Sequence, residues 1–268
     1  MELRGKVVVV TGGGSGIGAA LCRRFAAEGA QGIAVADLQG ENAEQVAGEI
    51  GGLAFPCDVS QETQVRELVK RTEARFGPVD LFCANAGTGA GTGGGLLEGG
   101  PFVSDAAWGQ SWDVNLMAHV YAARIVLPAM LERKSGYILT TASAAGLLTE
   151  IGSLAYSVTK HAALAFAEWL AIRYAEHGIG VSCLCPQGVR TPMLESAAEA
   201  AGGARHLVEG ALDPEDVAEV VVQGLAREEF LILPHPEVEG YFQRKASDYD
   251  RWLVGMRRLR AKTFPNDP

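Results

Sequence analysis

Short apolar runs alternate with longer amphipathic stretches along most of this chain. The first run, Lys6–Thr11, contains four valines in succession and ends at glycines. A continuous apolar run of this length is typical of a parallel strand that is buried on both faces. Comparable runs cover Gly32–Asp37, Leu53–Cys57, Val79–Ala84, Tyr137–Thr141, Ile179–Cys185 and Phe230–Leu233. Because amphipathic segments separate these runs, the pattern predicts an α/β fold, a parallel sheet covered by helices on both faces.

The amphipathic segments have the period of helices. One helix is predicted from Asp105 to about Glu132, and another from near Tyr156 to His177. After the last strand, apolar residues at spacings of three, four and seven predict one further amphipathic helix: Phe242, Tyr249, Trp252, Leu253, Met256 and Leu259. No repeat or domain break interrupts the pattern, so we predict one domain over residues 1–234 and a helical extension over 235–268.

Composition narrows the possible functions. The formal net charge of −9 argues against nucleic-acid binding, which depends on basic patches. No apolar run approaches the roughly 20 residues needed to span a bilayer, and the N-terminal run indicates a first strand and not a signal peptide. Five cysteines lie mostly in apolar stretches, as expected for reduced thiols in a cytoplasmic protein. Cys183 and Cys185 have strand spacing and no second Cys/His cluster, so we expect no metal site.

A glycine-rich loop, Thr11–Gly18, joins the first strand to the first helix with the sequence TGGGSGIG. Glycines let a backbone approach a pyrophosphate, and a helix N-terminus favours its negative charge. The spacing is G-x-x-x-G-x-G and not the commoner G-x-G-x-x-G. We expect this loop to bind a dinucleotide through Gly12, Ser15, Gly16, Ile17 and Gly18.

An acidic residue, Asp37, ends the second predicted strand about 20 residues beyond the glycine loop, where this type of fold binds a ribose 2′-hydroxyl. The next residue is Leu38 and not arginine, and the loop has no basic residue. Because a carboxylate repels a 2′-phosphate, the sequence favours NAD over NADP. Asp58 and Val59 follow the third strand, and we expect them near the adenine.

Tyr156 and Lys160 lie four residues apart in the segment IGSLAYSVTK, so a helix would place them on one face. A lysine ammonium beside a phenol favours the phenolate, which predicts a lowered tyrosine pKa and proton transfer near neutral pH. Ser143, just after the fifth strand, could hold a carbonyl or alcohol oxygen against Tyr156. Asn115 lies in a predicted helix and would be either a structural hydrogen-bonding residue or part of a proton path.

These segments occur together and in order, with Asn85–Gly87 (NAG) between the glycine loop and Asn115. The chain therefore resembles the short-chain dehydrogenase/reductase family over about residues 4 to 234. The resemblance implies a Rossmann-type, doubly wound parallel sheet of about seven strands. It also implies a catalytic centre of Ser143, Tyr156 and Lys160 helped by Asn115, in which Asn115 holds a water that connects Lys160 to solvent.

The family resemblance extends the expected cofactor site. Asn85, Ala86 and Gly87 would contribute to it, and Lys160 would bind the nicotinamide ribose beside Tyr156. The segment PQGVRTPM is similar to a family segment beside the nicotinamide, which implies contacts from Pro186, Val189 and Thr191. Gln187 occupies a position where the family usually has glycine, so it could add a polar side chain near the substrate.

The expected reaction is hydride transfer between NAD and a secondary alcohol or ketone, in which Tyr156 takes the hydroxyl proton. The glycine-rich stretch 88–100 is predicted to be a loop at the rim of the site. Candidate substrate contacts are Leu96, Leu148, Ile151, Gln187 and Met193, which suggest a largely apolar small molecule. The family and the apolar faces of the two long helices predict a homotetramer, without a nucleic-acid or membrane partner.

Two other functions are compatible with parts of this pattern. A sugar-nucleotide epimerase or dehydratase shares the tyrosine-lysine pair, but such enzymes usually have a larger C-terminal substrate domain. A non-catalytic NAD-binding sensor would not need all four residues of the expected catalytic centre. The C-terminal helix has three possible positions: on its own domain, on a neighbouring subunit, or over the substrate mouth.

Overall fold

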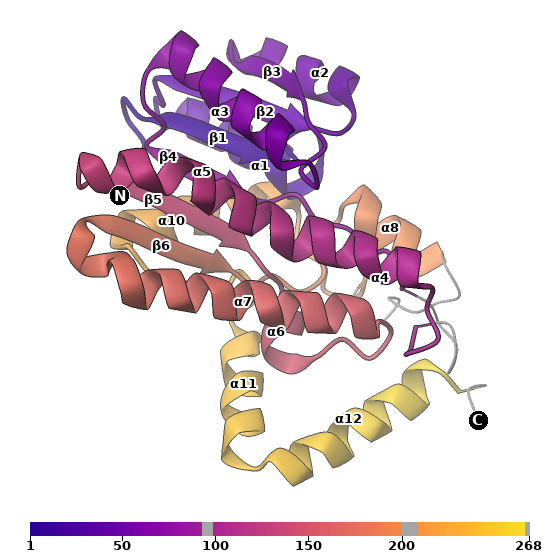
Figure 1. The fold of residues 1–268 in the computed structure, drawn as a ribbon. Helices are drawn as coiled ribbons and strands as arrows, with labels where there is room; N and C mark the ends of the chain where they lie inside the picture. Colours follow the sequence, from indigo (N-terminus) through magenta and orange to yellow (C-terminus); the bar gives the residue numbers. More distant parts are fainter. Residues whose placement is uncertain (93–98, 200–207, 266–268) are drawn as a thin grey trace.

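A parallel sheet with the strand order β3-β2-β1-β4-β5-β6-β7 lies at the centre of the protein (Figure 1). We describe it from a computed structural model, over residues 1–92, 99–199 and 208–265. The strands are β1 (Val7–Thr11), β2 (Gly32–Asp37), β3 (Leu53–Pro56), β4 (Leu81–Ala84), β5 (Gly136–Thr141), β6 (Ile179–Leu184) and β7 (Leu231–Ile232). The predicted seven-stranded, doubly wound sheet is therefore confirmed. Because β1 pairs with both β2 and β4, the order reverses there, and such a reversal opens a crevice at the carboxyl ends of the strands.

Helices cover both faces of the sheet, and each face has its own apolar core. One face carries α1 (Gly16–Ala27), α2 (Gly40–Ile50) and α10 (Pro214–Arg227). The other carries α3 (Glu62–Phe76), α5 (Ala118–Glu132) and α7 (Leu154–Tyr174), and α7 continues into a 3₁₀ turn, Ala175–His177. Shorter helices are α6 (Ala145–Leu148) and α8 (Pro192–Glu199). All residues of β1 are buried, because both faces of this central strand are covered.

The long helix predicted from Asp105 to Glu132 has three parts. α4 (Asp105–Trp112) leads into a π-helical turn, Asp113–Met117, and then into α5. Asp105–Glu132 is long and apolar enough to span a membrane, with a mean hydropathy of 1.4, although the sequence indicated no such run. Half of its most apolar window is buried inside the protein, so this one helix is weak evidence for a membrane span. We interpret it as a core helix.

The C-terminal tail contains two helices and not the single helix predicted. α11 (Glu237–Ser247) and α12 (Tyr249–Thr263) meet at Asp248, whose carboxylate accepts a hydrogen bond of 2.9 Å from the Arg251 amide. This cap begins a new helix where the apolar spacing predicted a continuous one. In Figure 1 the two helices form an angled arm below α6 and α7. The proposed division between residues 234 and 235 stays a prediction.

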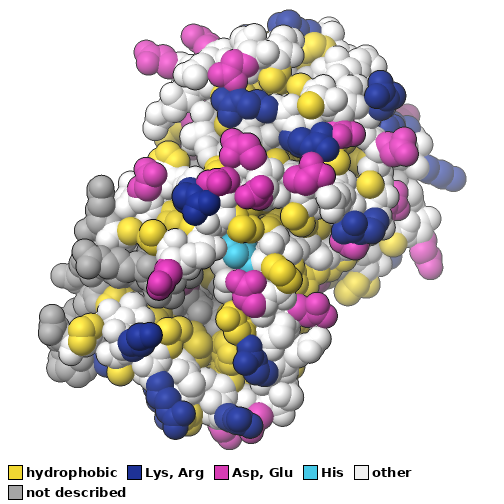
Figure 2. Space-filling view, turned by 180° about the vertical axis from the view of Figure 1, so that it is seen from behind, with side chains coloured by type: hydrophobic (Ala, Val, Ile, Leu, Met, Phe, Trp, Pro, Cys, Tyr) yellow, Lys and Arg dark blue, Asp and Glu magenta, His cyan; other side chains and the backbone are white. Residues whose placement is uncertain are grey.

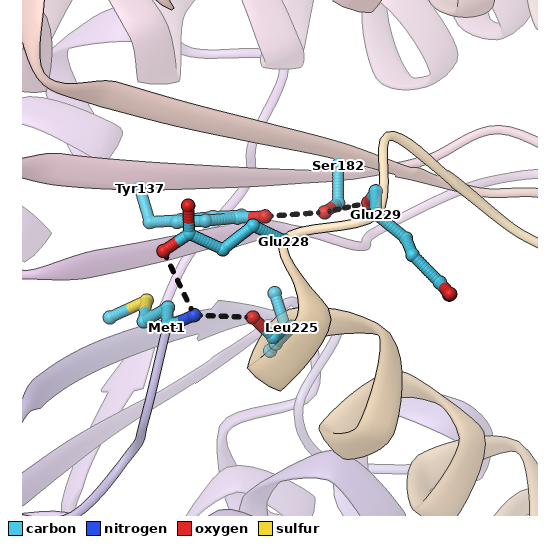
Figure 3. Close-up of polar contacts among 6 residues, drawn as sticks. All are labelled: Met1, Tyr137, Ser182, Leu225, Glu228 and Glu229. Carbon is cyan, nitrogen blue, oxygen red and sulfur yellow. Dashed lines mark hydrogen bonds and ion pairs between the residues drawn. The ribbon is translucent and has the colours of Figure 1, made fainter.

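Paired polar groups hold the connection from α10 to β7 (Figure 3). The Tyr137 hydroxyl lies 2.8 Å from the Ser182 hydroxyl, which donates at 2.6 Å to the Glu229 carbonyl. Burial raises the pKa of Tyr137, which keeps its phenol neutral as a donor. The Met1 amino group donates to the Leu225 carbonyl, at the end of α10. These contacts fix the connection that leads from α10 into β7.

Candidate functional site

A cavity of about 1170 Å³ lies at the carboxyl ends of the strands. Almost every residue predicted for the cofactor, the catalytic centre and the substrate lines this cavity, although these residues come from distant parts of the chain. Those that line it are Gly12, Ser15, Gly16, Ile17, Gly18, Asp37, Leu38, Asp58, Val59, Asn85, Ala86, Gly87, Ser143, Leu148, Ile151, Tyr156, Lys160, Pro186, Gln187, Val189, Thr191 and Met193. Asn115 lies behind the lining, and Leu96 lies outside the described residues.

The glycine loop has the tight geometry that its sequence predicted. A Cβ atom on Gly18 would lie 1.9 Å from the Gly12 carbonyl oxygen, so a side chain cannot fit there. Gly16 has φ +48 at the start of α1, a left-handed conformation that favours glycine. The loop therefore brings backbone and the N-terminus of α1 directly to the cavity, an arrangement suited to a pyrophosphate.

Asp37 is held in place by backbone groups. Its carboxylate accepts hydrogen bonds of 2.9 Å from the Gly14 and Gln39 amides. A carboxylate has about four acceptor positions, so two hydroxyl groups could still donate to it. Leu38 beside it is 74% exposed and gives no cationic partner for a 2′-phosphate.

The catalytic candidates come from β5 and α7. Ser153 caps α7 by accepting a hydrogen bond from the Tyr156 amide, so Tyr156 lies in the first turn and Lys160 one turn later. The Lys160 ammonium lies 5.6 Å from the centre of the Tyr156 ring and donates to the Thr141 carbonyl at 3.0 Å. Ser143 follows β5 and accepts a hydrogen bond of 3.1 Å from the Ala145 amide. The fold thus brings all three groups to one wall of the cavity.

The tyrosine pKa is not lowered as the sequence predicted. Burial raises the pKa of Tyr156, and the neighbouring Ser143 hydroxyl only partly opposes this effect. Burial also lowers the pKa of Lys160 to about 8, because the ammonium has lost its water. The charge of the lysine favours the phenolate, but the desolvation of both groups opposes it.

Asn115 is fully buried in the π-helical turn. Its side-chain oxygen accepts a hydrogen bond of 2.8 Å from the Thr88 amide, and its amide group donates to the Thr88 carbonyl at 3.0 Å. It also donates to the Thr159 hydroxyl at 3.2 Å. The side chain therefore holds the strand-end segment near Thr88 against α7, one of the two roles that the sequence left open.

His235 was not predicted to belong to the site. It is buried, and its Nδ1 atom accepts a hydrogen bond of 3.2 Å from the Gln187 amide. Its Nε2 atom lies 3.1 Å from the Gly188 carbonyl oxygen. Gln187 is found where glycine was expected, and its backbone amide is therefore hydrogen-bonded to His235. A single histidine after a strand gives no spacing signal, so sequence reasoning could not identify this contact.

The tail supplies a further wall that the sequence only partly indicated. One face of α12 lines the cavity, together with residues of α11: Tyr241, Arg244, Ser247, Asp248, Arg251, Trp252, Gly255, Met256 and Leu259. The apolar spacing had identified Trp252, Met256 and Leu259, and covering the substrate mouth was one of the proposed roles.

Figure 2 shows acidic and basic side chains interspersed over the upper part of the far face, with hydrophobic side chains gathered lower down. No cluster of metal-ligating side chains occurs among the described residues.

Comparison with known proteins connects this cavity to an established group of enzymes. The family model for short chain dehydrogenase matches residues 6–202. A 2,5-dichloro-2,5-cyclohexadiene-1,4-diol dehydrogenase of Sphingobium indicum is 41% identical over 199 residues, which are 73% of this chain and 77% of the relative. A 1-deoxy-11-beta-hydroxypentalenate dehydrogenase of Streptomyces exfoliatus is 34% identical over 245 residues, 88% of this chain and 86% of the relative.

Solved structures that resemble this chain include a member of the same group of enzymes. A short chain dehydrogenase/reductase from Burkholderia phymatum, solved in complex with NAD, superposes with a TM-score of 0.81. It is 28% identical, and the match covers 93% of this chain and 96% of that one. The similarity therefore includes both the sheet and most of what surrounds the cavity.

Proposed function

Because this chain belongs to the short-chain dehydrogenase/reductase family, and is a nicotinamide-dependent oxidoreductase acting on CH–OH groups, we propose that it transfers hydride between NAD and a secondary alcohol on a largely apolar molecule. The observation that carries the proposal is that one cavity joins the glycine loop to Ser143, Tyr156 and Lys160. Neither a sugar-nucleotide epimerase nor a non-catalytic sensor finds support.

We assign the chemical roles as follows. Ser143 holds the substrate oxygen, and Tyr156 takes its proton as the C–H bond gives up hydride. NAD accepts that hydride when it is bound. Lys160 binds the nicotinamide ribose and favours the tyrosinate, although burial opposes both charges. Asn115 supports this centre through its contact with α7 and holds a water on the path to solvent.

NAD is proposed over NADP because of Asp37. Its carboxylate lies at the cavity, held by two amides, and Leu38 offers no positive charge. A 2′-phosphate would bring like charges together, which costs several kcal/mol. Since about 1.4 kcal/mol is tenfold, NAD is expected to exceed NADP by at least about a hundredfold in kcat/KM. Equal efficiency with both cofactors would contradict this assignment.

The proposed substrate is an alicyclic or similarly apolar secondary alcohol. Leu148, Ile151 and Met193 line the cavity from the core, and Trp252 and Met256 line it from the tail. Two relatives are named for a cyclohexadiene diol and for hydroxypentalenate, which supports a hydroxyl group carried on a hydrocarbon skeleton. We propose no nucleic-acid or membrane partner, and a cytoplasmic location in view of the five buried thiols.

A panel of alcohols tests the function directly. Purified protein would be mixed with NAD and each secondary alcohol, with cyclic, steroid, fatty and aromatic members, and NADH formation followed by absorbance. We expect turnover of apolar members and none of sugar nucleotides. Binding of NAD without turnover of any alcohol in the panel would favour the sensor and contradict the proposal.

A further inference from the structure

Two buried polar side chains connect the C-terminal tail to two adjoining segments beside the cavity, which the Ala144 amide joins by donating to the Pro186 carbonyl at 2.8 Å. His235 begins the tail and is 4% exposed, and Lys245, in the last turn of α11, is 8% exposed. Both form hydrogen bonds with backbone atoms of the core, and the Lys245 ammonium also lies 5.6 Å from the centre of the Tyr249 ring. Buried polar groups are costly without partners, so these contacts specify where the tail sits as well as holding it there.

His235 bonds to the segment that we assign to the nicotinamide. Because Nδ1 accepts from the Gln187 amide at 3.2 Å, the ring proton is on Nε2, which donates to the Gly188 carbonyl at 3.1 Å. One neutral imidazole therefore joins the amide of Gln187 to the carbonyl of the next residue, Gly188, in the segment between Pro186 and Val189, which both line the cavity. Burial lowers the pKa of His235, which is consistent with the neutral form.

Lys245 bonds to the segment that we assign to the substrate. Its ammonium donates to the Leu147 carbonyl at 2.6 Å, near the end of the short helix α6. A cation is favoured there because the last carbonyls of a helix lack intrahelical donors. The helix ends at Thr149, which has φ +78, a strained conformation for a residue with a branched side chain. Lys245 thus supports the turn that presents Leu148 and Ile151 to the cavity.

We propose that His235 and Lys245 are positioning residues through which the tail sets two adjoining parts of the cavity wall: His235 the part beside the nicotinamide and Lys245 the part beside the substrate. The inference rests on the proposed function for the meaning of the two walls. It makes the tail part of the binding machinery, attached at two points with separate effects. Apolar contacts alone, such as those of the fully buried Val238, would not separate cofactor binding from substrate binding.

The cofactor arm of the test compares three His235 variants. His235→Phe removes both ring nitrogens, His235→Asn keeps an acceptor near the Nδ1 position, and His235→Gln keeps a donor near the Nε2 position. We expect His235→Phe to weaken NAD binding about tenfold in calorimetry without substrate, the effect of about one lost buried hydrogen bond. We also expect faster hydrogen exchange at the Gln187 amide in the cofactor-free protein. His235→Asn should recover more NAD affinity than His235→Gln.

The substrate arm compares Lys245→Met, which keeps the apolar stem, with Lys245→Arg, which keeps a donor. Lys245→Met should raise KM for the alcohol about tenfold and leave the Kd for NAD unchanged, and Lys245→Arg should recover part of the loss. Lys262→Met, on an exposed part of α12, is the matched control and should change neither value. Melting curves identify any variant that does not fold.

Two outcomes would overturn the inference. One is that His235→Phe has the same NAD affinity and the same rate of hydrogen exchange at the Gln187 amide as the wild-type protein. The other is an equal effect of Lys245→Met on cofactor and substrate, which would indicate general loosening. The binding and exchange measurements need no turnover, so they remain interpretable even if no alcohol in the panel is oxidised and the proposed function fails.

Discussion

At the scale of single residues, burial decides the electrostatics of the site. Tyr156 and Lys160 have both lost water, so their pKa values move in the directions that disfavour charge. The residue types and spacing that identify this pair can be read from the sequence, and the cavity contains both. The desolvation of Tyr156 and Lys160 cannot be read from the sequence, because it depends on other segments that pack around them, such as the end of β5.

Tyr156→Phe tests the proton transfer. The change removes only the hydroxyl, so turnover should fall by about 10²- to 10⁴-fold while NAD binding remains. Tyr121→Phe on α5 is a matched control, since Tyr121 does not line the cavity. Steady-state turnover near the wild-type value in the Tyr156 variant would remove this residue from the mechanism.

Lys160 should reduce stability at neutral pH. Its pKa is about 8 in the folded protein and 10.5 as the ordinary value. Between these two pKa values only the unfolded chain holds the proton, so the free energy of unfolding rises with pH across this window. Below about pH 8 the destabilisation by the buried ammonium is complete. Lys160→Met should therefore raise the melting temperature at neutral pH and abolish turnover, although the Thr141 carbonyl loses its donor. The gain should shrink as the pH rises above about 8 and disappear above 10.5, and a gain that is independent of pH would contradict this explanation.

At the scale of elements, the buried strands were the most predictable part. Val7–Thr11 and Gly32–Asp37 agree with the sequence prediction to within one residue, because strands covered on both faces need continuous apolar runs. The π-helical turn around Asn115 was not predictable, since its wider hydrogen bonding leaves no mark in residue type. The break in the tail was missed for a similar reason. Apolar spacing continues through Asp248, and only the cap shows that a second helix begins.

Removal of residues 240–268 tests the role of the tail. The deletion takes away Lys245 and all of α12 but keeps His235. KM for the alcohol should rise, because Trp252, Met256 and Leu259 no longer line the cavity, whereas NAD binding should survive. If the shortened protein keeps its KM, its assembly and its melting temperature, then the tail is dispensable.

At the scale of the whole molecule, apolar side chains remain exposed on the long helices. Trp112 is 43% exposed on α4, and Trp169 and Ile172 are 57% and 84% exposed on α7. Large apolar side chains that gather in an exposed patch usually mark a surface that another chain covers. The proposed homotetramer would cover them, and light scattering at micromolar concentration should give a mass about four times that of one chain. A monomeric mass would contradict the proposal.

The depth of the five cysteines has a practical consequence. All are buried, and burial raises the pKa of Cys57 to about 12 and that of Cys83 well above its usual range. Thiol reagents attack the exposed thiolate, so the native protein should give almost no labelling background. A cysteine placed at Val254, which is 41% exposed on α12, would then take a fluorescent dye at one position. The movement of the tail during turnover could be followed optically, without first removing any natural cysteine.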